Sequence, residues 1–97
     1  MKLSSADIDF LKNFFSNKPV KKAFVFGSYS RNDANADSDL DILVELDYSK
    51  HVGLQFIQMK YEIEEALHKK VDLISENSIS KYILPFINQD KQLIYER

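Results

Sequence analysis

The chain has 97 residues, 44% of them hydrophobic and 29% charged, which is typical of one soluble globular domain over residues 1–97. Its 13 basic and 15 acidic residues give a net charge of −2, which argues against strong nucleic-acid binding by this chain alone. The absence of cysteine excludes a disulfide framework, a thiolate nucleophile and a Cys-based zinc site. No apolar stretch approaches the roughly 18 residues of a membrane span, and residues 1–4 do not open a signal peptide, so we expect a cytoplasmic location.

Local patterns predict the elements of the first half of the chain. Ser4 and Asp7 form the S-x-x-D pattern of a helix start, and apolar residues then recur at helical spacing. An apolar run ends at the Gly27-Ser28 corner, and a polar segment separates it from a second apolar run. We therefore expect a helix from Ser4 to about 17, a strand over Val20–Phe26, a short helix over 28–32, and a strand over Leu40–Leu46.

The second half is predicted from the same two periodicities. Apolar side chains at positions 52, 56, 59, 63 and 67 predict an amphipathic helix over Val52–His68, with His51 and His68 near its ends as surface residues or caps. Later apolar residues predict a last helix that Pro85 disturbs. The remaining expected elements are a strand over Val71–Ser75, that helix over about 79–87, and a short terminal strand over Gln92–Tyr95.

Three aspartates and the Gly-Ser corner suggest a phosphate and cation site. Asp39 and Asp41 open the second strand two positions apart, so both side chains point to one face of the sheet. At Gly27 the backbone has no Cβ to keep phosphate oxygens away. If Ser28 and Asp39 serve one site, the first two strands run antiparallel. For Asp72 to join them, the third strand must run parallel to the second, across a helical crossover. This predicts a mixed sheet flanked by helices.

A divalent cation would relieve the repulsion between these carboxylates. Hard oxygen ligands, without cysteine or histidine at ligand spacing, favour Mg²⁺, with Mn²⁺ as the alternative. An aspartate pair at the mouth of a strand is by itself weak evidence for a cation site, because many such aspartates are only exposed surface groups. Arg31 is either a ligand of the phosphates or an exposed loop arginine, and Ser38 either caps the loop or reaches a phosphate.

The spacing G-S, ten residues, then D-x-D resembles the signature of the DNA polymerase β-like nucleotidyltransferases. Arg31 and Ser38 also match, in G-S-x-x-R and S-D-x-D, and the short length is similar to the minimal nucleotidyltransferase (MNT) group. The resemblance implies the nucleotidyltransferase fold, an α/β (α+β) domain with a small mixed sheet and the order α-β-α-β-α-β-α.

The resemblance also implies a role for each matching residue. Asp39, Asp41 and Asp72 are expected to be catalytic and to bind two Mg²⁺ ions, with Asp72 on the acceptor side. Four residues are expected to hold the triphosphate of ATP: Gly27, Ser28, Arg31 and Ser38.

Three functions follow as expectations. The first is an enzyme that moves AMP from ATP to a hydroxyl, on a tyrosine of a partner HEPN toxin, so that the chain is an antitoxin by AMPylation. The second is an antitoxin that acts by binding alone. The third is a nucleotidyltransferase of small molecules, similar to those that modify aminoglycosides. The sequence leaves open the acceptor, the preferred nucleotide, the oligomeric state and the dependence of activity on a partner.

Overall fold

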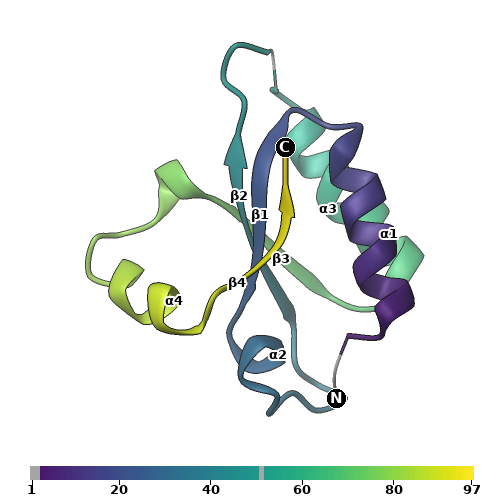
Figure 1. The fold of residues 1–97 in the computed structure, drawn as a ribbon, viewed down its shortest axis with the longest axis vertical. Coiled ribbons are helices and arrows are strands. Elements are labelled where there is room, and N and C mark those ends of the chain that lie inside the picture. The colour runs from purple at the N-terminus through teal and green to yellow at the C-terminus, as the bar shows by residue number, and fades with distance from the viewer. Residues whose placement is uncertain (1–2, 51) are drawn as a thin grey trace.

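The computed structural model describes residues 3–50 and 52–97. None of the helices among these residues is long and apolar enough to cross a membrane. The elements, shown in Figure 1, are α1 (Ser5–Ser16), β1 (Val20–Phe26), α2 (Ser28–Arg31), β2 (Leu40–Leu46), α3 (Gln55–Leu67), β3 (Val71–Ser75), the 3-10 turn η1 (Glu76–Ser78), α4 (Leu84–Asp90) and β4 (Gln92–Glu96).

Most predicted boundaries are confirmed, including those of β1, β2 and β3. The Ser4 hydroxyl accepts a hydrogen bond from the Asp7 N–H at 3.0 Å, and the Asp7 carboxylate accepts one from the Ser4 N–H at 3.2 Å, so the predicted cap of α1 is present. The short terminal strand is also present, as β4.

Two helix predictions were wrong at their starts. Helix α3 begins at Gln55 instead of Val52, because residues 52–54 form a turn in which Gly53 has a φ of +46°. The last helix, α4, begins at Leu84 instead of at about residue 79, and Pro85 does not disturb it. Pro85 lies in the first turn of α4, where a missing N–H costs no helical hydrogen bond. His51, expected as a surface residue, lies outside the described residues.

The four strands form one mixed sheet in the order β3-β2-β1-β4. Strand β1 pairs antiparallel with β2 and with β4, whereas β2 pairs parallel with β3. The directions argued from the positions of the aspartates are therefore confirmed, and α3 forms the crossover between the two parallel strands.

The two faces of the sheet are covered unequally. Helices α1 and α3 lie on one face (Figure 1) and contribute to the larger core, which includes Phe15, Val25, Ile42 and Ile63. On the other face Phe24 and Leu43 form a smaller cluster with Ile87 of α4. Because alternate residues of a strand face opposite ways, Asp41 shares its face with Leu43 and with this smaller cluster. The carboxylates therefore lie on the less covered face, beside α4.

Candidate active site

A row of three residues crosses the sheet at the mouth of β2. Asp41 is the register partner of Phe26 on antiparallel β1 and of Asp72 on parallel β3. Neighbouring strands lie about 4.8 Å apart, so Asp41 and Asp72 are adjacent on one face. Asp39 lies directly before β2, and its negative charge acts on Asp41. The topology therefore brings together all three predicted carboxylates.

The electrostatics of Asp41 differ from those of an ordinary surface carboxylate. Its pKa is raised from 3.8 to about 6, first by burial and then by the negative charges of Asp72 and Asp39. The positive charge of Arg31 opposes this rise. The ionised form of Asp41 is thus disfavoured by its surroundings, and a cation bound beside it would stabilise that form.

Gly27 makes the close approach of Asp41 to the backbone possible. Its φ is +74°, a conformation that other residues adopt only with strain. A Cβ at this position would lie 2.4 Å from Oδ2 of Asp41, which is too close for a non-bonded carbon atom. Helix α2 begins directly after Gly27 and has no side-chain hydrogen bond at its N-cap. The Gly27-Ser28 corner therefore places the Asp41 carboxylate beside a stretch of backbone without a side chain and beside the start of α2.

Arg31 lies at the other end of α2, where α4 meets the corner. Its Nη1 donates to Oδ2 of Asp90 at 2.7 Å, and its Nε donates to Asp33 at 3.2 Å. These two hydrogen bonds, with the charges of the same carboxylates, raise the pKa of Arg31. Ser30 also donates a hydrogen bond to the carbonyl oxygen of Asp90. Helix α4 is therefore fastened to α2, and a phosphate that reaches Arg31 must compete with two carboxylates.

Ser38 has a structural role in the loop before β2. Its hydroxyl accepts a hydrogen bond from the Asn35 N–H at 2.9 Å, and the Asn35 side chain accepts one from the Asp37 N–H at 2.8 Å. This supports the loop-capping interpretation of Ser38. These turn contacts shape the loop that leads through Asp39 to the start of β2.

The donor types fit a hard divalent cation, but the carboxylates do not form a closed cage. In positions 3–50 and 52–97, no three Asp, Glu, His or Cys side chains are arranged to hold a metal ion. Mg²⁺ usually takes one or two carboxylates and completes its shell with waters and substrate phosphates. An open row of aspartates beside the Gly27-Ser28 corner is compatible with that mode of binding.

A groove of about 390 Å³ runs between this corner and α4. One side is polar and includes Gly27, Ser28, Arg31 and Asp41. The other side is apolar, and its exposed members are Ile83 and Phe86. Sequence reasoning assigned positions 79–87 to an amphipathic helix and missed these two as site residues. Ile83 is one of the apolar residues whose spacing predicted that helix and was expected on its core face, whereas Phe86 is an apolar residue outside this spacing.

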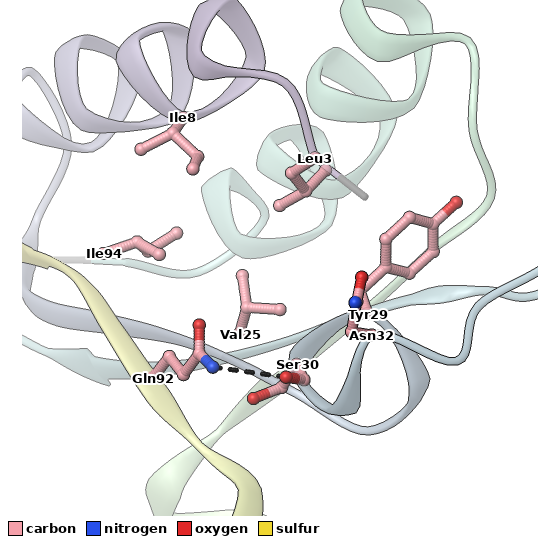
Figure 2. A pocket seen from close by; sticks show the side chains of 8 residues that line it. All are labelled: Leu3, Ile8, Val25, Tyr29, Ser30, Asn32, Gln92 and Ile94. Atoms are coloured by element: carbon pink, nitrogen blue, oxygen red, sulfur yellow. Dashed lines mark hydrogen bonds between the residues drawn. The ribbon is translucent and has the colours of Figure 1, made fainter. Parts of the chain in front are cut away.

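A second cavity, of about 340 Å³, lies on the opposite face of the sheet (Figure 2). Val25 and Ile94 line it, and Gln92 donates a hydrogen bond at 3.2 Å to the carbonyl oxygen of Ser30 at its edge. Among the residues that the structure describes, no Asp, Glu, Lys, Arg or His lines this cavity, so these residues supply none of the charged groups that phosphate transfer needs. Tyr29, which follows Ser28 in the chain, is only 8% exposed and belongs to the larger core.

Comparison with known proteins places the chain in a family. Residues 7–97 match the family described as "Polymerase beta, Nucleotidyltransferase". A relative from Methanocaldococcus jannaschii, MJ0435, provisionally named a protein adenylyltransferase, is 50% identical over 60 residues. The match covers 62% of this chain and 63% of that relative, so it spans less than two thirds of its length.

Two solved structures share the fold. One, provisionally named a minimal nucleotidyltransferase, has a TM-score of 0.81 and 26% identity, with 95% of each chain covered. The other belongs to a complex of a tri-AMPylated HEPN toxin of Shewanella oneidensis with an MNT antitoxin. It has a TM-score of 0.72 and 17% identity, and the match covers 95% of this chain and 71% of that one.

The family match extends over nearly the whole chain and includes the Gly-Ser corner and all three aspartates. The chain therefore belongs to the polymerase β-type nucleotidyltransferase family of enzymes.

Proposed function

We propose that this chain is a protein adenylyltransferase that moves AMP from ATP to a tyrosine of a HEPN-family toxin and thereby acts as an antitoxin. The observation that carries the proposal is the row in which Asp41 lies between the Gly27 corner and Asp72. The name of the MJ0435 relative and the AMPylated toxin in the related complex support the choice of a protein acceptor.

The reaction requires one bond to form and one to break. The acceptor oxygen attacks the α-phosphorus of ATP, the bond from that phosphorus to the oxygen bridging to the β-phosphorus breaks, and pyrophosphate leaves. Asp72 lies on the far side of Asp41 from the corner, where it would receive the proton of the attacking hydroxyl. Gly27 and Ser28 would hold the β- and γ-phosphates through backbone N–H groups and the hydroxyl.

Asp39, Asp41 and Asp72 are the residues that would hold Mg²⁺, with Mn²⁺ as the alternative. Two such ions, when bound, would neutralise the triphosphate and stabilise both the entering and the leaving oxygens. Arg31 would add positive charge near the leaving pyrophosphate after exchanging its contact with Asp90 for a phosphate.

ATP labelled separately on the α- and the γ-phosphate tests the reaction class. The chain is incubated with Mg²⁺, the labelled ATP and a purified HEPN-family protein encoded next to it, and the proteins are then separated. We expect the α-label on the HEPN protein and the γ-label only in pyrophosphate, and we expect Asp72→Asn to transfer neither. Transfer of the γ-label would indicate a kinase, and binding of ATP without any transfer would favour an antitoxin that acts by contact alone.

A further inference from the structure

The exposed apolar side of the groove is unusual because it lies directly beside charged groups. Ile87, on the buried side of α4, packs with Phe24 and Leu43 and fixes the helix on the sheet. Phe86 is left 69% exposed and Ile83 55% exposed, and both line the groove that contains Asp41. Exposed apolar side chains gathered at a concave site often mark a binding surface.

The chemistry of the groove matches a ligand with two different ends. Backbone, Ser28 and Arg31 on one side suit an anion, whereas the ring of Phe86 on the other side suits a flat apolar group. A volume of about 390 Å³ is within the range of about 300–1,000 Å³ that small-molecule sites occupy. A nucleoside triphosphate has both ends, and its base can stack on an aromatic ring.

We infer that Phe86, with Ile83 beside it, forms the platform on which the base of the nucleotide stacks. This inference rests on the proposed function, since it places the rest of the nucleotide whose phosphates the corner would hold. The motif of the Gly-Ser corner and the aspartate pair does not extend to α4. Of the two aromatic residues that flank the corner, Tyr29 is buried, and Phe26, which also lines the groove, is partly buried against the smaller cluster.

The same groove argues against the acceptor as the occupant of the platform. Its lining includes Gly27, Ser28 and Asp41 but neither Asp39 nor Asp72. Asp72 lies across β2 from the corner, so an acceptor that delivers its proton there approaches from the opposite side of Asp41. Phe86 is thus on the nucleotide side of the site. Because every base presents a π face, this platform would bind adenine and guanine alike.

Helix α4 is held firmly enough to serve as a platform. The carbonyl oxygen of Asp90 at its end accepts a hydrogen bond from Ser30 of α2, and Ile87 packs against the sheet; neither contact involves Arg31. Helix α2 starts at the Gly27-Ser28 corner and contacts the end of α4, so α2 links the helix that carries Phe86 to the corner. The distance between base and phosphate sites would therefore be set by these contacts.

Calorimetric titration with two ligands tests the platform. The full chain is titrated, in Mg²⁺, with ATP and with inorganic tripolyphosphate, which has the phosphates but no base. Phe86→Ala is compared with Tyr82→Ala, a matched truncation of an aromatic side chain that is 77% exposed and lies outside the groove. Phe86→Trp serves as the conservative variant that keeps a flat ring.

We expect Phe86→Ala to weaken ATP binding roughly tenfold and tripolyphosphate binding less than about twofold, since stacking contributes on this scale. Tyr82→Ala should bind both ligands like the wild type, and Phe86→Trp should retain ATP affinity. Unchanged ATP affinity in Phe86→Ala would overturn the inference, and so would an equal loss for both ligands, because Phe86 would then only shape the corner. Failure of the wild-type chain to bind either ligand would instead overturn the proposed function itself.

Discussion

Replacing Asp41 by asparagine should stabilise the fold while it removes transfer. The pKa of Asp41 is raised from 3.8 to about 6, first by burial and then by Asp72 and Asp39. A rise of this size corresponds to about 3 kcal/mol of preference for the protonated form. Solvent screening at this half-buried position and the desolvation of the new amide reduce the gain, so we expect about 1–3 kcal/mol at pH 7.

The sign of the pH dependence follows from the direction of the shift. Because the folded-state pKa of Asp41 is above its unfolded value, ionisation weakens the fold as pH rises from about 4 to about 6, and the full penalty is present above that range. Below about pH 4 the carboxyl is protonated in both states, so Asp41→Asn should then gain little over the wild type.

Thermal unfolding in EDTA at pH 7 and at pH 4 measures this difference. In a domain of this size the expected gain at pH 7 raises Tm by roughly 5–15 °C. Asp39→Asn, a change to an exposed carboxylate directly before β2, is the matched control and should shift Tm much less. The reasoning is refuted if Asp41→Asn is less stable than the wild type at pH 7, or if its gain is the same at pH 4.

Three further changes test other parts of the structure. Gly27→Ala should lower the free energy of unfolding by about 1–3 kcal/mol and impair transfer, because the φ of Gly27 is +74° and a Cβ would meet a carboxylate oxygen at 2.4 Å. Chemical denaturation measures this loss, and an unchanged midpoint would contradict it. Val25→Asp should lose at least about 4 kcal/mol in the same assay, since Val25 is 3% exposed, and a well-folded variant would show that β1 tolerates charge. Hydrogen bonds from the Ser49 hydroxyl and from Arg97 hold the pKa of Asp47 well below its usual range, so its contribution is present above about pH 4 and is lost as pH falls further. Asp47→Asn should remove this acid sensitivity in pH-dependent unfolding. An acid-unfolding profile like that of the wild type would contradict the contribution assigned to Asp47.

Much of the fold was predictable because its strands are short apolar runs with polar boundaries. The limits of β1, β2 and β3 follow from the runs at Val20–Phe26, Leu40–Leu46 and Val71–Ser75. Strand direction was predictable for a different reason, since only one arrangement brings Asp72 to the mouth of β2. The convergence of Asp41 and Asp72 on one face is thus a consequence of strand alternation and topology.

The parts that sequence reasoning missed depend on tertiary packing. Periodicity identifies an apolar helix face but does not decide which side of a short helix is covered, so the exposure of Phe86 beside the corner was not predictable. The ion pair of Arg31 with Asp90 joins residues 59 positions apart, and no local pattern indicates it. Tyr29 follows the corner directly in sequence, yet the turn of α2 directs its ring into the core.

The central claim is that the chain protects a cell by chemical transfer at this row of aspartates. Its most direct test is the intact mass of the HEPN partner after co-expression with the wild-type chain or with Asp72→Asn, together with cell survival. We predict one or a few added AMP groups and survival with the wild type, and an unmodified partner and loss of survival with Asp72→Asn. Survival with an unmodified partner would contradict the enzymatic account.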